Sequence, residues 1–466
     1  MTPNHARPAQ APTAPPGCPA PTGVPLYGPD FAADPGRVYE HLRQYGAAAP
    51  VQLAPGIHAT LVTSYHLALD VLRNPELFSK DARRWKALAA GEVPADHPLL
   101  PMMAYRPNAL FSDGYAHARL RQAITDSLAR LNPHELRGDI QRHAHRLIDR
   151  FAPTGEADLI AQYAQGLPIL VFSQMFGLAD DAGDTLIHAL AALFEGGDGA
   201  AEGYATYSRY LQDLVTLKRR QPGADVTSWL MAHPARLDDA EVLNQCVLLI
   251  GAGTEPVQNL IGNALRLLLS DERFGGGLSD GSTPIDDALE EVLWKDPPMA
   301  NYAVHYPLYD VDLAGVRLPA GEPVVISLAA ANTDPHGDPS LHRSGNRAHL
   351  AFSAGPHACP ARDPARLIAA VAIERLLDRL SDLELAVPAD RLNWRPGPFQ
   401  RALTALPVRF TPTRVDSPSG GNAWTAPAPS TVWTSPAATS TPKPPSFAPP
   451  VQRPWWSSLT AWLRGR

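Results

Sequence analysis

Apolar residues recur every three or four positions along most of the chain, a spacing that predicts amphipathic helices. One pattern, over 238–269, is apolar on most sides and is therefore predicted to be a buried helix. Ser64 precedes another pattern in the position of a helix cap. The predicted helices cover residues 35–45, 64–72, 135–151, 159–176, 181–194, 201–220, 225–231, 238–269, 286–294 and 361–380.

Short β-branched and aromatic runs between turn residues predict strands. Two of them flank a turn at 54–56, and the others lie in the C-terminal third of the chain. The predicted strands cover residues 51–53, 59–63, 303–306, 309–313, 316–318, 323–329, 383–387 and 408–411. Together the patterns predict a mainly α fold with a smaller β region over residues 26–415, and the length alone would suit two or three domains.

Both ends of the chain differ in composition from this region. Residues 1–25 are rich in proline and alanine and are predicted to be disordered, as is the Pro/Ser/Thr-rich tail over 416–466. The tail ends in residues 454–466, where tryptophans, leucines and terminal arginines form an amphipathic pattern. We interpret this segment either as a motif that binds a partner protein or a membrane surface, or as a tail without a role.

Composition and charge narrow the class of protein. The chain has 466 residues, 45% of them hydrophobic, and a net charge of −7, so nothing indicates a nucleic-acid partner. Its 3 cysteines are too far apart for a disulfide framework, which favours a cytoplasmic location. The N-terminal stretch lacks the apolar core of a signal peptide, and no run approaches the ~20 apolar residues of a membrane span. The sequence thus predicts a cytoplasmic globular protein, and peripheral membrane attachment through the tail stays open.

The most informative stretch runs from Phe352 to Arg366. It is polar and broken by glycine and proline up to Cys359, and then becomes an amphipathic helix pattern. The free N–H groups of a first helical turn favour an anion, so Cys359 is predicted to shift towards the thiolate, the form that binds metals. His357 adds a basic group two residues earlier. We interpret Cys359 as a metal ligand; the alternative is a buried cysteine at a helix start.

Two further segments contain candidate chemistry. In the first, Asp113 is a plausible helix cap, and His117 and Arg121 share one helix face, either as a site or as a solvated charged surface. In the second, the turn 251–256 interrupts the long buried helix with glycines and a proline, which predicts a local kink with freed carbonyl groups. A carboxylate, Glu255, stands in that turn, so the turn is either a site or only a bend.

The sequence resembles a bacterial cytochrome P450 over residues 26–411. The family pattern F-x-x-G-x-H-x-C…A-R is matched by Phe352, Gly355, His357, Cys359, Ala365 and Arg366. The resemblance implies the mainly helical haem-thiolate fold as one domain over residues 26–415, with haem b (iron protoporphyrin IX) as cofactor and Cys359 as the ligand of its iron. Such a thiolate favours cleavage of the O–O bond. The resemblance also implies a monooxygenase that uses O₂, electrons from a ferredoxin and a ferredoxin reductase, and a small apolar substrate.

Other family positions follow from the same resemblance. His117, Arg121 and His357 match residues that contact the haem propionates. The run Ala252-Gly253-Thr254-Glu255 matches the oxygen-binding groove of the long distal helix. Glu255 is the candidate within that run for a proton-relay role.

Several departures from the family pattern affect the expected chemistry. The threonine whose hydroxyl helps to deliver protons is replaced by Pro256, so O–O cleavage is expected to be slower or uncoupled. A propionate-binding arginine is replaced by His305, whose charge depends on pH. The loop before the cysteine and the helix after it also differ from the family, at Ser353, Ala361 and Pro364.

The arginine of the family's E-x-x-R pair is also missing, because Trp294 stands three residues after Glu291. We expect Trp294 to pack against apolar groups. Glu291 is expected to find another partner, such as Arg343 or Arg347, since a half-removed buried ion pair is costly. The chain thus resembles a P450 subgroup that lacks this arginine. Two functions stay open: a monooxygenase, or a haem-binding, catalytically impaired partner protein in a signalling or companion-P450 complex.

Overall fold

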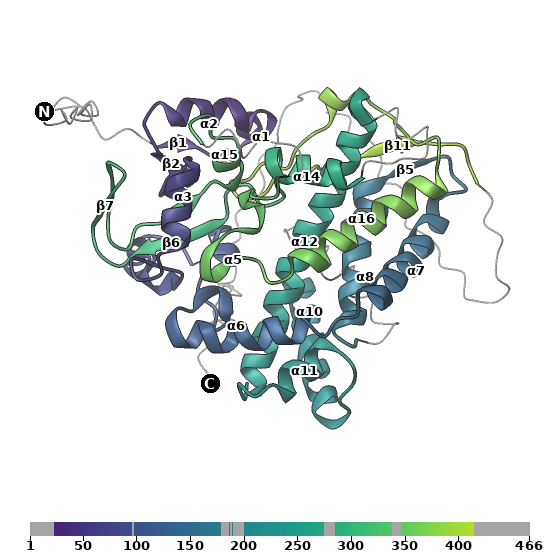
Figure 1. The fold of residues 1–466 in the computed structure, drawn as a ribbon, viewed down its shortest axis with the longest axis horizontal. Coiled ribbons are helices and arrows are strands. Elements are labelled where there is room, and N and C mark those ends of the chain that lie inside the picture. The colour runs from purple at the N-terminus through teal and green to yellow at the C-terminus, as the bar shows by residue number, and fades with distance from the viewer. Residues whose placement is uncertain are drawn as a thin grey trace, which may run out of the picture. The chain divides into compact units, whose positions relative to one another are not determined.

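The structure, a computed structural model, is mainly helical with a smaller sheet region, which confirms the predicted fold class (Figure 1). The predicted tail and most of the predicted helix over 181–194 lie outside the described residues. The described residues are 23–95, 97–178, 200–274, 285–337 and 346–413, together with Leu186 and Ala189.

Helices form the larger part of the described chain, and none of them combines the length and apolarity needed to cross a bilayer. The sequence pattern does not predict α1, α4, α5 or α15, because helices this short contain too few repeats of an apolar spacing. The helices are α1 (Pro29–Ala33), α2 (Pro35–Arg43), α3 (Tyr65–Leu72), α4 (Lys86–Ala89), α5 (Leu100–Met103), α6 (Gly114–Leu128), α7 (Pro133–Phe151), α8 (Gly166–Met175), α10 (Ala200–Arg220), α11 (Val226–Ala232), α12 (Asp239–Ser270), α14 (Ile285–Lys295), α15 (Leu328–Asn332) and α16 (Arg362–Arg379).

Helix α12 runs through the middle of the molecule and packs against α8, α14 and α16 (Figure 1). It begins with a capping box, in which Asp238 accepts from the Glu241 N–H at 2.8 Å and Glu241 accepts from the Asp238 N–H at 3.1 Å. Residues 242–246 and 257–265 of α12 are buried, so contacts with neighbouring helices stabilise it. Because α12 lies in the centre of the fold, an exposed side chain on it is a candidate for lining a functional site.

The sheet region contains one six-stranded sheet in the order β1-β2-β3-β9-β6-β4, a three-stranded sheet β10-β11-β5 and the hairpin β7-β8. Strands β6 and β4 pair antiparallel at one edge of the larger sheet. The predicted strand pair around 54–56 is confirmed, with longer strands than expected. The strands are β1 (Val24–Pro25), β2 (Ala48–Ala54), β3 (Ile57–Val62), β4 (Phe78–Ser79), β5 (Glu156–Asp158), β6 (Ala303–Pro307), β7 (Val311–Leu313), β8 (Val316–Leu318), β9 (Val324–Ile326), β10 (Glu384–Leu385) and β11 (Pro407–Arg409).

The predicted strand over 323–329 is wrong in its second half. The strand β9 ends at Ile326, and the hydroxyl of Ser327 then accepts from the Ala330 N–H at 3.0 Å and caps α15. A serine followed by leucine and alanines is a helix start, because alanine has the highest helix propensity and serine caps well. The continuous apolar run concealed this signal.

The predicted cap at Ser64 is also only half right. Ser64 occupies the N-cap position of α3, but its side chain makes no capping hydrogen bond. Instead the Asp334 carboxylate accepts from the Tyr65 N–H at 2.9 Å. An acidic group from a distant loop therefore satisfies the free N–H of this helix.

Candidate functional site

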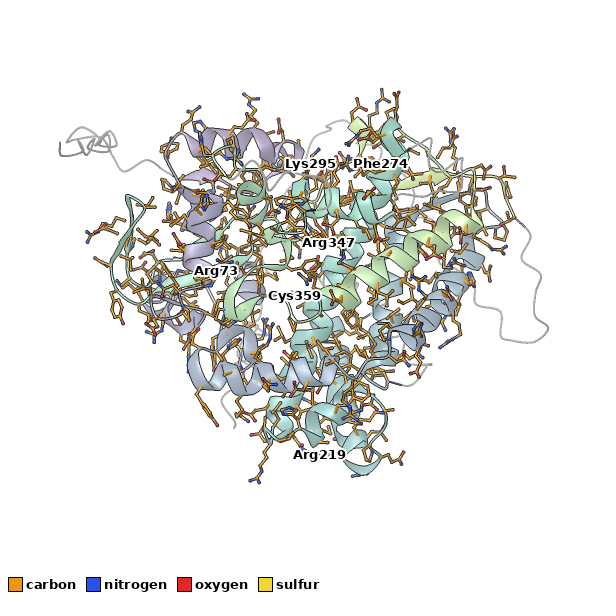
Figure 2. The ribbon with its side chains drawn as sticks, in the orientation of Figure 1. Arg73, Arg219, Phe274, Lys295, Arg347 and Cys359 are labelled. Carbon is orange, nitrogen blue, oxygen red and sulfur yellow. The ribbon has the colours of Figure 1, made fainter. Side chains whose placement is uncertain are left out.

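Cys359 lies in the loop before the N-terminal end of α16 (Figure 2). Two single-turn 3-10 segments, Leu350–Phe352 and Gly355–His357, lead into it. The Cys359 N–H donates to the Phe352 carbonyl at 2.8 Å, and the Ala361 N–H donates to the Cys359 sulfur at 3.4 Å. The cysteine therefore precedes the first turn of α16 and receives a hydrogen bond from the residue that caps it.

The protonation of Cys359 differs from the prediction. Burial raises the pKa of the Cys359 thiol above its usual value, and the Ala361 N–H together with the charges of Arg121 and Arg362 only partly offset this. The predicted shift towards thiolate is thus wrong for the polypeptide by itself, because desolvation outweighs the helix start. A bound metal cation would supply the missing charge, since a coordinating thiol is deprotonated outright.

Two backbone conformations shape the loop before the cysteine. Gly355 has φ 68°, and a Cβ at this position would overlap the carbonyl oxygen of Leu72 at the end of α3. Ser353 has φ 61° and ψ −170°, a region that is almost confined to glycine. The loop thus lies directly against α3 and includes one strained serine.

Three elements outside the loop hold the residues just before it. They are α3, α14 and α15, and each contributes one hydrogen bond to residues 346–350. The bonds run from the Trp294 indole to the Asn346 carbonyl at 2.9 Å, from the Tyr65 hydroxyl to the Ala348 carbonyl at 2.7 Å, and from the Leu350 N–H to the Asn332 side-chain oxygen at 2.6 Å.

Basic side chains of α6 face the cysteine loop. The rings of His117 and His357 are 4.0 Å apart, and the Arg121 guanidinium donates to the Ala358 carbonyl. His117 and Arg121 therefore share one helix face as predicted, and that face meets the protein rather than solvent. The alternative of a solvated charged surface does not fit a buried His117.

His117 has an unmet hydrogen-bonding atom. Its Nε2 is buried and has no hydrogen-bond partner among the described residues. Burial and the nearby His357 and Arg121 lower the pKa of His117 to about 4, so the imidazole is neutral at pH 7. A buried polar atom without a partner indicates a group that completes the site, such as an anion or water.

Asp113 occupies the N-cap position of α6, but its side chain does not cap the helix. The predicted capping role is therefore wrong. Its carboxylate accepts from the Ser79 hydroxyl at 2.5 Å and the Lys80 N–H at 3.1 Å, and lies 3.8 Å from His357. Burial opposes ionisation of Asp113, but these donors outweigh it and hold the pKa of the carboxyl well below its usual value. Asp113 thus joins β4 to the cysteine loop.

His305 lies on β6 and is buried. Its Nδ1 is 3.0 Å from the Ala303 carbonyl, to which it donates. Burial and the neighbouring Lys80 charge lower the pKa of His305 well below the usual histidine value, so it is neutral at pH 7. The charge of His305 was predicted to depend on pH. Because its pKa is lowered, this change of charge takes place below the neutral pH range.

On α12, the predicted turn is a continuous part of the helix, which passes through Pro256 without a break. The N–H missing at Pro256 would bond the Ala252 carbonyl, four residues earlier. Ala252 is exposed although it lies in the middle of a mostly buried helix, so water can reach this segment. The lost bond is therefore tolerated on the exposed side of α12 at Ala252, which we call its open face.

The other residues of this turn face three different ways. The Thr254 hydroxyl donates to the Ile250 carbonyl at 2.7 Å, within the helix. A Cβ added to Gly253 would overlap the Phe172 ring of α8, so this glycine allows close helix packing. Glu255 turns towards the loop 394–402. Ala252 is thus the member of the turn on the open face.

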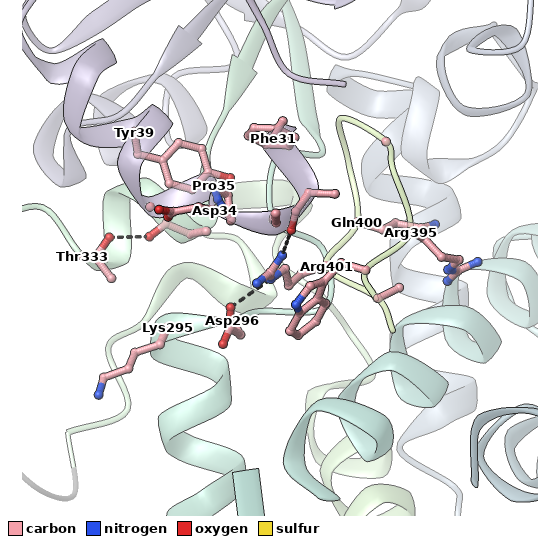
Figure 3. Close-up of a pocket in the computed structure, with 18 residues that line it drawn as sticks. Phe31, Asp34, Pro35, Tyr39, Lys295, Asp296, Thr333, Arg395, Gln400 and Arg401 are labelled. Carbon is pink, nitrogen blue, oxygen red and sulfur yellow. Dashed lines mark hydrogen bonds and ion pairs between the residues drawn. The ribbon is translucent and has the colours of Figure 1, made fainter. Parts of the chain in front are cut away.

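Glu255 is bound on two sides by residues of the loop 394–402. Its carboxylate lies 2.9 Å from the Arg395 guanidinium and accepts from the Gln400 amide at 2.6 Å. Arg395 also donates to the Asn259 side chain, one helical turn later, at 3.2 Å. Figure 3 shows Arg395 and Gln400 in the wall of a cavity of about 250 Å³ bordered by α1, α2 and this loop.

The pairing of Glu291 differs from the prediction. Glu291 pairs with Arg273 at 2.6 Å and Lys295 at 2.8 Å on the surface. Arg347 instead lies 3.3 Å from Glu290, and Arg343 lies outside the described residues. Glu290 and Glu291 are neighbours in α14, and one residue along an α-helix turns the side-chain direction by about 100°. This rotation places Glu290 on the inner face of α14 and Glu291 on the outer face.

Glu290 is the acid at the inner face of α14. It pairs with Arg366 of α16 and lies 3.5 Å from Nε2 of His349, which precedes the cysteine loop. The Trp294 indole stands edge-on to the His349 ring at 5.7 Å and donates a hydrogen bond to the Asn346 carbonyl, so these contacts are with polar groups rather than the predicted apolar ones. Glu290, His349 and Arg366 form a cluster that joins α14, α16 and the cysteine loop; we call it the Glu290 cluster.

Sequence reasoning missed Lys80, Glu290, His349 and Arg395. His349 stands three residues before Phe352 and could have been suspected from that proximity. For the others, no local motif gives a signal, because their partners are 76 to 224 residues away in the chain. Arg395 was missed because the loop 394–402 has no regular secondary-structure pattern.

These features fit a haem with a cysteine ligand. Cys359 is solvent-exposed although protein surrounds it closely enough to raise the pKa of its thiol. His117 has a free Nε2 beside it, and Arg121 adds a positive charge. A thiol for iron and basic groups for two propionates are the donor set that an iron porphyrin needs. The fold and this site together define the class of haem-thiolate proteins.

The comparisons with known proteins identify the family, although no family model matches the chain. The cytochrome P450 monooxygenase PikC of Streptomyces venezuelae is 35% identical over 396 residues, covering 82% of this chain and 92% of that protein. The vitamin D(3) 25-hydroxylase of Pseudonocardia autotrophica is 31% identical over 402 residues, covering 83% and 96%. The chain belongs to the cytochrome P450 family, whose members are haem-containing oxidoreductases.

Solved structures agree with this assignment. The myxobacterial cytochrome P450 CYP267B1 in complex with myristic acid matches with a TM-score of 0.73 at 28% identity, and the match covers 83% of this chain and 98% of that one. The fold and family implied by the loop around Cys359 are therefore confirmed.

Proposed function

We propose that the protein is a monooxygenase that holds haem b through Cys359 and oxidises a small apolar molecule. The observation that supports this most is the surroundings of Cys359: an exposed thiol in a closely packed loop, beside a buried His117 with a free Nε2. Haem bound to a thiolate supplies the chemistry that cleaves O₂. A ferredoxin and a ferredoxin reductase are the electron donors that the family resemblance suggests.

The chain's own residues would have separate roles in this reaction. Cys359 would bind the iron, and His117, Arg121 and His357 would bind the propionates, with His305 nearby. Phe352 and Gly355 would fix the loop around the cysteine. Ala252 would leave room on the open face of α12, because its side chain is small and exposed.

The proposed substrate class rests on the relatives. One relative is named for vitamin D(3), and one solved structure holds myristic acid, and both compounds are elongated and largely apolar. No charged recognition group is needed for such a molecule, because apolar burial supplies most of the binding energy. A library of long-chain and polycyclic apolar compounds is therefore the first set to screen.

Glu255 is our candidate for holding the proton that the reaction consumes. Pro256 has no hydroxyl, so a proton has to leave Glu255 through water or through a substrate group. Arg395 Nε and Asn259 Nδ2 are buried without partners among the described residues, which favours water between them. Such water would connect Glu255 with the cavity beside Gln400.

Reduction of the purified protein under carbon monoxide tests the proposal. A red-shifted, thiolate-type absorption band is expected, and Cys359→Ala should abolish it. Persistence of the band in that variant would show that Cys359 is not the ligand. Consumption of NAD(P)H with a ferredoxin system and the apolar library then tests turnover.

A second function is a haem-binding, catalytically impaired partner protein, and Pro256 is the observation that favours it. We further propose that the chain belongs to the subgroup without the E-x-x-R arginine, because Trp294 replaces it. Tight haem binding without any turnover would favour the partner function over the monooxygenase.

We propose that residues 416–466 form a tail outside the P450 domain, which spans 26–415, and that 454–466 binds a partner protein or a membrane surface. Deletion of 417–466 should leave the absorption spectrum unchanged and abolish liposome flotation or partner pull-down. If deletion changes neither, the tail has no such role.

A further inference from the structure

Lys80 is a buried lysine that the proposed mechanism does not yet use. It follows β4, and its side chain is 7% exposed. Its ammonium donates to the Val304 carbonyl at 2.6 Å, the one hydrogen bond of this group within the described part of the chain. An ammonium has three N–H donors, and burying a charge with donors unmet is costly. The Lys80 ammonium can therefore donate a hydrogen bond to a further acceptor.

The strand register brings Lys80 beside His305. In the β4–β6 ladder, Phe78 pairs with Pro307 and Ser79 with Tyr306. The strand β4 ends at Ser79, and the next residues along the two segments are Lys80 and His305. The Lys80 ammonium reaches the backbone of β6 next to His305, at the Val304 carbonyl. The lowered pKa of His305 has the Lys80 charge among its causes, which agrees with this proximity. Lys80 thus lies beside His305, the position where the resemblance expects an arginine in the family.

The charges around this point are unbalanced. Lys80 and Arg121 are both cations near the cysteine loop, and Asp113 is the acid that acts on Lys80. Asp113 is already engaged by the Ser79 hydroxyl, the Lys80 N–H and His357. The lysine ammonium itself forms no ion pair with any described residue, and it lines a small cavity with Met102, Phe111 and Tyr302. An anion is the group that would balance it.

We propose that the Lys80 ammonium binds a haem propionate in place of the arginine that the family resemblance expects at position 305. This inference rests on the proposed haem binding. A propionate is favoured over a substrate carboxylate because the Arg121 guanidinium and the unpaired Nε2 of His117 face the same cysteine loop. A charge-assisted hydrogen bond from a buried ammonium is strong, because little water competes for it.

Haem transfer to an excess of apomyoglobin tests the proposal, with thermal unfolding of each apo variant as a folding check. Lys80→Met should release haem roughly 10- to 100-fold faster than the unsubstituted protein, the range of a charge-assisted hydrogen bond. Lys80→Arg should keep most of the retention, and His305→Arg added to Lys80→Met should restore it. Lys295→Met, at an exposed lysine, is the matched control and should have no effect.

The dimethyl ester of haem, which lacks propionate charges, separates binding from folding. The unsubstituted protein and Lys80→Met should release the ester at the same rate. Equal acceleration for haem and its ester would overturn the proposal, since Lys80 would then act only through Val304. Unchanged haem release together with weaker myristate binding would overturn it in favour of a substrate contact. If the unsubstituted protein holds no haem at all, the proposed function fails instead.

Discussion

Replacing Glu290 by glutamine is expected to loosen the cysteine loop, because Glu290 joins that loop to α14 and α16. In the structure its carboxylate pairs with Arg366 and lies 3.3 Å from Arg347 and 3.5 Å from His349. The side chains of Glu290 and Arg366 are each 14% exposed. Glutamine keeps the size of the side chain and removes its charge, so Arg366 would be left without its main partner.

The expected loss in the free energy of unfolding is about 3 kcal/mol, at the lower end of the range for breaking a buried ion pair from one side. Glu291→Gln is the matched control on the neighbouring residue. Its partners Arg273 and Lys295 are 59% and 64% exposed, so the expected loss is below about 1 kcal/mol. Urea unfolding of both variants and the reduced carbon monoxide spectrum measure the difference.

The dependence of stability on acidic pH is a second measurement for the Glu290→Gln variant. Burial opposes ionisation of Glu290, but His349 and Arg366 outweigh it and lower the pKa of the carboxyl below its ordinary 4.5. A lowered native pKa means that the charge stabilises the fold above about pH 4.5 and that this stabilisation is lost as the pH falls through the native pKa. The stability of Glu290→Gln should therefore depend less steeply on pH than that of the unsubstituted protein as the pH falls below about 5.

The outcome that refutes this reasoning is a larger effect at Glu291. If Glu291→Gln lowers the stability and the thiolate-type band more than Glu290→Gln does, then Glu291 is the inner acid, as the sequence pattern suggested. Equal and small effects would mean that the hydrogen bonds donated by Trp294 and Tyr65 and accepted by Asn332 suffice to hold the loop.

Three further predictions concern the loop and the distal helix. Ser353→Gly should stabilise the protein by about 1 kcal/mol in a urea titration, because a strained residue costs about 1–3 kcal/mol and the flexibility of glycine offsets part of the gain. Ala354→Gly is the control: residue 354 is extended, with φ −145°, so this variant should instead be destabilised. Pro256→Thr should raise the share of NADH consumption that yields oxidised product rather than hydrogen peroxide, because threonine restores a hydroxyl and an N–H for the Ala252 carbonyl. An unchanged peroxide yield would contradict this. His117→Leu should weaken haem retention at neutral pH, measured by transfer to apomyoglobin, and His134→Leu at an exposed histidine is its control.

Local patterns in the sequence were sufficient for the elements that frame the site. The long helices, the loop at Cys359 and the shared face of His117 and Arg121 follow from periodicity and from turn residues. These features depend on residues close together in the chain, where spacing decides geometry. The thiol pKa did not follow, because it depends on how much protein surrounds the sulfur.

Contacts between distant segments could not be predicted in the same way. The choice between Glu290 and Glu291 depends on the rotation of α14 against α16, which a single sequence does not define. Lys80 meets His305 only through the register of β4 against β6. Glu255 meets Arg395 because an irregular loop returns to α12. Each of these pairings depends on tertiary packing rather than on local propensity.

The hydrogen bonds that hold residues 346–350 have a consequence for cofactor uptake. Helices α3, α14 and α15 fix this segment through groups that belong to the polypeptide alone. Ordering a flexible loop costs roughly 1–2 kcal/mol per residue, and a loop that is ordered beforehand avoids that cost at the moment of binding. The apoprotein should therefore bind its cofactor in a loop that is already ordered. Its affinity for the cofactor should be higher, because the conformational entropy of this segment is lost during folding and not during binding.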